Sequence, residues 1–166
     1  MKTYRDILQE LFDTKIKIRV ASDNDTVFSA FFYVPAEKSD NLFEFQFVAT
    51  KSTGRSGDVE FEPEDEWNII FLRVGKPGEK SAIDVFNDMT AKEVFSVFSG
   101  VKTAMLRWYK SQKPDYFAFT SKSAEGSRVK LYKKFAKSIA KKLNLNMISG
   151  KVKSNEKFVF TTKNKW

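Results

Sequence analysis

The sequence predicts an α/β (α+β) protein in which a mixed, mostly antiparallel central sheet is flanked by helices. Three patterns predict this class. Several stretches in the first half alternate apolar and polar residues, two later stretches repeat apolar residues at helical spacing, and an apolar strand separates those two helices. A strand between two helices indicates a parallel crossover inside an otherwise antiparallel sheet. The 166 residues fit a single domain, 1–166.

The first half of the chain predicts one helix and three strands. Residues 3–12 place their apolar side chains on one helical face, with Thr3 as N-cap. Asn24 and Asp25 form a turn between the first two strands, so these strands should make a hairpin. The three alternating stretches are 15–22, 26–34 and 42–50.

A long polar segment separates these strands from the next one. Residues 51–66 are rich in small polar and acidic side chains and predict a loop. Residues 67–74 are almost continuously apolar, which predicts a strand near the centre of the sheet that is buried on both faces. Residues 81–86 predict a short returning strand.

The second half predicts two helices and three strands. Residues 90–93 have the pattern of a capping box, with Thr90 as N-cap and Glu93 reaching back, and the helix runs to Gln112. Residues 115–121 form an apolar strand. The second helix spans 127–144 with Ser127 as its cap, and the closing strand pair lies at 146–152 and 157–163.

Composition limits the chemistry. Cysteine and histidine are absent, which excludes disulfides, thiolate zinc sites and Ser-His-Asp or Cys-His relays. An enzyme would have to use carboxylates, Lys, Tyr, hydroxyls, backbone dipoles or carboxylate-bound Mg²⁺. We expect no metal, because the acidic residues between 60 and 66 lie in a loop without fixed geometry.

No window approaches the roughly 18 apolar residues of a membrane span, and the N-terminus lacks the apolar run of a signal peptide. We therefore expect a cytoplasmic protein without a membrane partner. Charge is unevenly distributed along it. Residues 114–166 carry 13 basic and three acidic residues, a net +10, whereas 1–113 carry 16 basic and 18 acidic residues, a net −2. This bias predicts a polyanionic partner: nucleic acid, a phosphorylated cofactor or an acidic protein surface.

The helix at 127–144 is the most amphipathic element and the main source of positive charge. Tyr132 lies at the start of its apolar face, where a phenol can meet solvent or a ligand. The other apolar positions are Leu131, Phe135, Ala136, Ile139, Ala140 and Leu143. The lysines, mostly on the opposite side, are Lys130, Lys133, Lys134, Lys137, Lys141 and Lys142.

This order of elements is similar to that of the GNAT superfamily of N-acyltransferases, in which a meander, a central strand, a helix, a strand, a second helix and a strand pair follow one another. GNAT proteins often carry A-x-x-L-Y-x-x-x-G-F on the last helix, with Tyr as general acid to the departing thiolate of coenzyme A. Residues 129–135, VKLYKKF, resemble this pattern and put Tyr132 at the matching place. The resemblance implies acetyl coenzyme A as cofactor, and Ser127, Arg128 and Lys130 at the start of this helix are its candidate binding residues. In the alternative, Arg128 pairs with Asp115 or Glu125.

Two features depart from the GNAT pattern. GNAT pyrophosphate loops place glycine-rich backbone at a helix N-terminus, whereas residues 87–93 contain no glycine and two acids, Asp88 and Glu93. That stretch would repel a pyrophosphate more readily than bind it. Ala136 and Lys137 replace the closing G-F. The resemblance therefore implies either an acyltransferase or a non-catalytic relative without the pyrophosphate loop.

A second hypothesis is a non-enzymatic binding protein that contacts nucleic acid or an acidic host protein through the 127–144 helix. Its anion contacts would be Lys133, Lys134, Lys137 and Lys141; in the alternative, these lysines form a solvated face and Tyr132 is a core aromatic. KPDYFAFTS and SRVKLYKKFA resemble stretches of small, unassigned tailed-phage proteins, which implies a phage origin.

Overall fold

The computed structural model describes residues 16–51, 66–74, 89–122, 126–152 and 155–162. The helix predicted at 3–12, the strand predicted at 81–86 and all but the first and last residues of the loop predicted at 51–66 lie outside these ranges. The described elements are, in order, β1 (Ile18–Asp23), β2 (Val27–Pro35), β3 (Leu42–Lys51), β4 (Trp67–Val74), α2 (Ala91–Gln112), β5 (Tyr116–Lys122), α3 (Gly126–Leu143), β6 (Asn146–Val152) and β7 (Asn155–Thr161).

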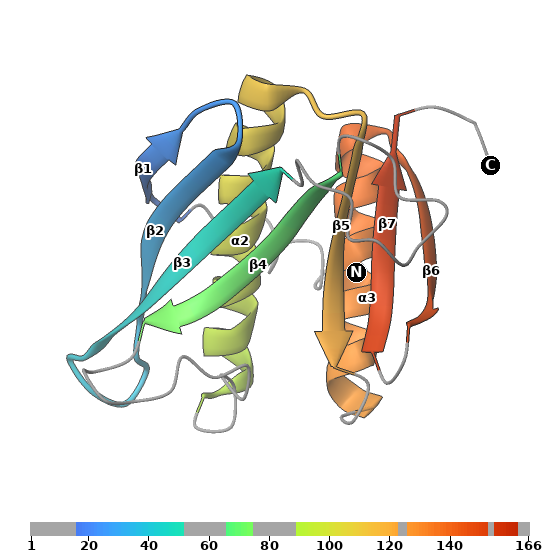
Figure 1. Cartoon of the computed structure of the whole chain (residues 1–166). Helices are drawn as coiled ribbons and strands as arrows, with labels where there is room; N and C mark the ends of the chain where they lie inside the picture. The colour runs from blue at the N-terminus through green and yellow to red at the C-terminus, as the bar shows by residue number, and fades with distance from the viewer. Residues whose placement is uncertain (1–15, 52–65, 75–88, 123–125, 153–154, 163–166) are drawn as a thin grey trace.

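The described strands form one seven-stranded sheet in the order β1-β2-β3-β4-β5-β7-β6. β4 and β5 are parallel, and every other neighbouring pair is antiparallel. The predicted mixed, mostly antiparallel sheet and its one parallel crossover are confirmed. The last strand, β7, lies between β5 and β6. Both α2 and α3 lie on the same face of the sheet (Figure 1), which we call the inner face.

Local sequence explains the first hairpin. The Asn24 side-chain oxygen accepts hydrogen bonds from the backbone N–H groups of Thr26 and Val27, each at 3.0 Å. The Asn24 N–H donates to the Val27 carbonyl across the turn at 3.0 Å. These bonds satisfy the polar groups of the tight turn, and β1 then pairs antiparallel with β2, as predicted.

The ends of α2 also follow from its sequence. Thr90 Oγ1 accepts from the Glu93 N–H at 3.2 Å, and Glu93 Oε1 accepts from the Thr90 N–H at 2.7 Å, so the predicted capping box is confirmed. At the other end Lys113 adopts a left-handed conformation, with φ 45°, and its N–H donates to the Tyr109 carbonyl. The helix spans Ala91–Gln112, the predicted end.

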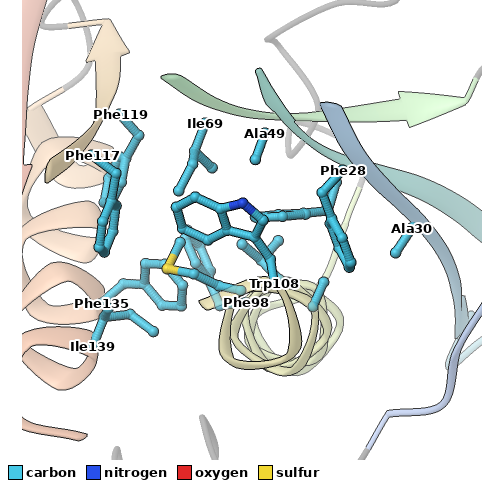
Figure 2. Packing of buried hydrophobic residues seen from close by; sticks show 14 of the residues in the cluster. Phe28, Ala30, Ala49, Ile69, Phe98, Trp108, Phe117, Phe119, Phe135 and Ile139 are labelled. Carbon is cyan, nitrogen blue, oxygen red and sulfur yellow. The ribbon is translucent and has the colours of Figure 1, made fainter. Parts of the chain in front are cut away.

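The core lies between the inner face of the sheet and the two helices. Figure 2 shows Trp108 of α2 at its centre, below the strands. The Trp108 ring is fully buried and packs edge-on against Trp67 of β4, at 5.5 Å between centroids, and Phe117 of β5, at 5.1 Å. Aromatic residues therefore connect the strand pair at the sheet centre to α2.

One prediction for β4 is wrong. The strand is central, the fourth of seven, but only its inner face is buried: Trp67 and Ile69 are each 4% exposed, whereas Ile70 is 51% exposed. Among the described elements both helices lie on the inner face, so the outer side chains of β4 have no described helix over them. A continuous apolar run does not by itself indicate two-sided burial.

α3 begins at Gly126, so Ser127 lies in the first turn, and the predicted cap at Ser127 is wrong. The helix ends near the predicted residue. Asn144 adopts φ 54°, and the Leu145 N–H donates to the Ala140 carbonyl at 2.8 Å. This left-handed residue ends the helix and directs the chain into β6.

Candidate active site at the β4–β5 fork

The parallel strands β4 and β5 pair only at their amino-terminal ends. Their described register joins Trp67 to Phe117, Asn68 to Ala118 and Ile69 to Phe119. Beyond these positions β4 continues to Val74 beside β3, and β5 continues to Lys122 beside β7. The two strands diverge in Figure 1. We call the diverging segments, residues 70–74 and 120–122, the β4–β5 fork.

The fork has the position expected of a ligand site. In open α/β sheets, ligands bind beyond the carboxyl ends of parallel strands, where neighbouring chain segments separate. The fork opens at the carboxyl ends of β4 and β5 because there β4 stays paired with β3 and β5 stays paired with β7. The register of β3 with β4 extends to Glu44 and Val74, and that of β5 with β7 extends to Lys122.

Tyr132 of α3 lies beside the fork. Its ring centroid is 5.9 Å from that of Phe71 on β4 and 6.3 Å from that of Phe119 on β5. The ring of Phe98 on α2 packs against it in a T-shaped contact at 5.4 Å. The Tyr132 side chain is half-buried. The predicted catalytic tyrosine thus contacts one aromatic ring from the β4 arm of the fork, one from the last residue of β5 that pairs with β4, and one from α2.

A second aromatic layer supports this cluster. Phe135, one turn after Tyr132 on α3, is 1% exposed and lies 4.9 Å from Phe98 and 6.1 Å from Phe119, measured between ring centroids. Because these neighbours are close-packed, the Tyr132 ring has a restricted orientation. A preorganised side chain of this kind suits a role in which a proton must be delivered to one position.

A side-chain hydrogen bond connects α2 and α3 further along the two helices. Lys102 of α2 is 4% exposed, and its Nζ donates a hydrogen bond to Ser138 Oγ of α3 at 3.1 Å. This polar contact connects the two helices that supply Phe98 and Tyr132. No pattern in the sequence predicts this contact.

The start of α2 does not suit a phosphate. Glu93 is 5% exposed, and its carboxylate accepts hydrogen bonds from the N–H groups of Thr90, at 2.7 Å, and Glu37, at 3.0 Å. The Glu93 N–H is bonded in turn to Thr90 Oγ1. A carboxylate and a hydroxyl therefore occupy the region where a pyrophosphate would meet backbone donors, in agreement with the sequence of residues 87–93.

The start of α3 is the alternative anion site. Gly126 follows the last residue of β5, Lys122, by four positions, so the helix begins near the open end of the fork. The side chains of Ser127 and Arg128 lie outside the described part of the chain, whereas Lys130 is exposed. The structure therefore places the backbone of Ser127 and Arg128 at the start of α3 and shows that Lys130 is exposed.

The predicted anion-contact lysines do not belong to the fork. Lys133, Lys134, Lys137 and Lys141 are all exposed. In contrast, Tyr132 and Phe135 on the same helix face the aromatic cluster. Tyr132 and these lysines thus occupy different faces of α3.

Glu66 also differs from its expected role. The sequence places it in an acidic loop, but it is 4% exposed, and its Oε1 lies 3.0 Å from Lys157 Nζ of β7. This contact has the distance of an ion pair without the geometry of a hydrogen bond. Glu66 therefore contributes to the attachment of β4 to the rest of the sheet.

Phe71, Phe98 and Phe119 are not among the site residues predicted from the sequence. A usable signal was available for two of them, because Phe71 and Phe119 lie toward the carboxyl ends of the predicted parallel strands. Phe98 had no such signal, since its contact with Tyr132 depends on how α2 and α3 pack.

Within the described ranges, no group of three or more His, Cys, Asp or Glu residues is arranged to hold a metal ion. Neither described helix is both long enough and apolar enough to cross a membrane. Comparisons of the chain with protein-family models, with curated proteins and with solved structures returned no match.

Proposed function

We propose that the protein is a GNAT-like N-acyltransferase that uses acetyl coenzyme A and binds the acyl thioester at the β4–β5 fork. One observation carries the proposal: Tyr132, the residue that the resemblance assigns as general acid, packs between Phe71 and Phe119 where the parallel strands separate.

The order of the elements supports the same proposal. A four-stranded antiparallel meander leads through α2 to a parallel strand, and α3 then leads to a closing strand pair. The resemblance to GNAT enzymes implies this same order of elements. The separation of β4 from β5 beyond Ile69 would allow the β4 backbone to present donors toward a thioester carbonyl.

The proposed chemistry uses the phenol of Tyr132. A thioester supplies an acyl group attached to sulfur. As the nitrogen of the acceptor amine bonds to the acyl carbon and the carbon–sulfur bond breaks, Tyr132 would give its proton to the departing sulfur. The proton released by the nitrogen passes to water or a carboxylate, and the phenolate is then reprotonated from water.

The fit to coenzyme A differs between its two ends. The fork and Tyr132 suit the thioester end, whereas the capped start of α2 with its buried Glu93 opposes the phosphates. We therefore propose that the phosphates bind at the start of α3, with Ser127, Arg128 and Lys130 as contacts. The N-terminus of a helix favours anions, and Arg128 adds a fixed positive charge.

Titration calorimetry with acetyl coenzyme A tests the proposal. The Arg128→Gln/Lys130→Gln variant should bind the cofactor about tenfold more weakly, equivalent to roughly 1.4 kcal/mol. The control variant Lys38→Gln/Lys110→Gln, which loses the same charge at exposed positions outside α3, should bind as the wild type does. No detectable heat with millimolar cofactor would overturn the proposal.

Tyr132→Phe separates binding from catalysis. The ring and its aromatic contacts remain, so cofactor affinity should be unchanged, while acetyl transfer to a panel of amines should fall by roughly a hundredfold or more. Tyr33→Phe is the matched control, because Tyr33 is 47% exposed on β2. A wild type that binds the cofactor and transfers no acetyl group would indicate a non-catalytic relative.

A further inference from the structure

The exposed face of α3 carries a row of lysines, of which the proposed acetyl transfer uses only Lys130. Five exposed lysines, which we call the lysine stripe, lie on one side of the helix: Lys130, Lys133, Lys134, Lys137 and Lys141. Lys142 is exposed as well but lies outside this stripe. At about 100° per residue the five lysines of the stripe fall within an arc of roughly 100°, opposite the buried side chains of the same helix. The stripe is therefore a continuous basic surface on the outside of the molecule.

We propose that the lysine stripe binds the phosphate backbone of double-stranded nucleic acid. α3 contains seven basic residues and no acidic ones. Lysines that are three or four positions apart repel one another and disfavour the helix. A polyanion relieves this repulsion and gains affinity by releasing its own counterions, so the charge pattern is complementary to a dense row of phosphates.

The length of the stripe also suits a phosphate backbone. From Lys130 to Lys141 the helix rises about 16 Å, at 1.5 Å per residue. One strand of duplex DNA places a phosphate about every 3.4 Å along its axis. The stripe therefore matches a run of roughly four or five phosphates without requiring the helix to bend.

The other side chains of α3 favour a duplex over single strands. Proteins that bind single strands combine basic grooves with exposed aromatic rings on which bases stack. The aromatic residues of α3, Tyr132 and Phe135, face inward and pack against Phe98. Lysine also lacks the planar fork with which arginine reads base edges. Binding should therefore depend on phosphates and be insensitive to sequence.

Fluorescence anisotropy of the full chain with a short labelled DNA duplex, over a series of salt concentrations, tests this proposal. For the wild type, log K should fall linearly with log salt. Lys133→Gln/Lys137→Gln/Lys141→Gln removes three contacts, so the slope should become shallower by roughly 2.7, at about 0.9 per contact. The control Lys17→Gln/Lys38→Gln/Lys110→Gln loses the same charge at exposed positions elsewhere and should leave the slope unchanged.

Three results would overturn the proposal. They are a wild type that does not bind the duplex, equal effects of the two triple variants, and tighter binding to polyglutamate than to the duplex, which would indicate an acidic protein partner. Circular dichroism checks that both variants retain their helices. Tyr132→Phe should leave duplex affinity unchanged, so failure of this proposal is distinguishable from failure of the acetyl-transfer proposal.

Discussion

The ring of Tyr132 stands edge-on against the ring of Phe98, with centroids 5.4 Å apart and planes at 83°. Phe98 is fully buried on α2, so this contact fixes Tyr132 of α3 against α2. Phe71 of β4 lies 5.9 Å from both rings, measured between centroids. The position of Tyr132 at the fork is therefore set by the packing of two helices and a strand.

Packing and proton transfer by Tyr132 should be separable by substitution. Tyr132→Ala should lower the free energy of unfolding by about 2 to 3 kcal/mol, because it removes a half-buried ring from the cluster. Tyr132→Phe keeps the ring and should lower it by less than about 1 kcal/mol. Urea denaturation measures both values. Equal losses for the two variants would contradict the assigned packing.

Gly100 permits the close approach of α2 to β2. A Cβ atom added there would clash with the Phe32 ring, and both residues are buried. Alanine favours a helix by up to about 1 kcal/mol over glycine, but the clash opposes this gain. Gly100→Ala should therefore lower the free energy of unfolding by roughly 1 to 3 kcal/mol, as measured by urea denaturation.

Two further variants check the cause of that loss. A Cβ at Gly150 of β6 would meet no atom within 4 Å, so Gly150→Ala should be nearly neutral. Combining Gly100→Ala with Phe32→Leu should cost less than the sum of the two single changes, because the shortened side chain makes room. Strict additivity would show that the Phe32 contact is not responsible.

The capping box should contribute measurably to α2. Thr90→Ala removes the acceptor of the Glu93 N–H and should lower the free energy of unfolding by about 1 kcal/mol. Thr90→Ser keeps the hydroxyl, so it should retain most of the free energy of unfolding that Thr90→Ala loses. Glu93→Ala should cost more, about 2 kcal/mol, because the N–H groups of Thr90 and Glu37 both lose an acceptor. Thermal denaturation can rank the three variants, and a reversed order would contradict these contacts.

Tyr109 should make the fold sensitive to alkali. Burial, and secondarily the charge of Asp115, raise the pKa of its phenol above the ordinary value. The folded chain therefore holds this proton more tightly than the unfolded chain. This contribution to stability is complete below about pH 10, the ordinary tyrosine pKa, and is lost as pH rises through the folded pKa.

Spectroscopic titration and unfolding as a function of pH check this sign. Tyr109→Phe should show a shallower loss of stability above about pH 10 than the wild type. Asp115→Asn removes the secondary cause and should lower the pKa of Tyr109. A phenol that titrates below its ordinary range in the folded protein would contradict the assignment.

Features determined by neighbouring residues could be predicted from the sequence. The Asn24 turn, the Thr90 capping box and the end of α2 at Gln112 each depend on bonds within a few positions. The parallel crossover followed from the placement of one strand between two helices. The amphipathic pattern also separated Tyr132 from the lysines of α3, and the structure places them on different faces.

Features determined by segments distant in sequence could not be predicted. The divergence of β4 from β5 after Ile69 depends on the pairing of β4 with β3 and of β5 with β7. The contacts of Tyr132 with Phe71 and Phe98 depend on the packing of α3 against α2 and the sheet. The exposure of Ile70 depends on which face of the sheet the helices cover. None of these relationships leaves a periodic signal in the chain.

The most direct test of the fork as the functional site is mapping of backbone amide shifts by nuclear magnetic resonance during titration with acetyl coenzyme A. We predict that the largest changes lie in residues 70–74 of β4, residues 120–122 of β5 and the first turn of α3. Residues of β1 and the end of α2 should change little. Changes confined to the lysine stripe, or no changes with millimolar cofactor, would contradict the assignment of the fork.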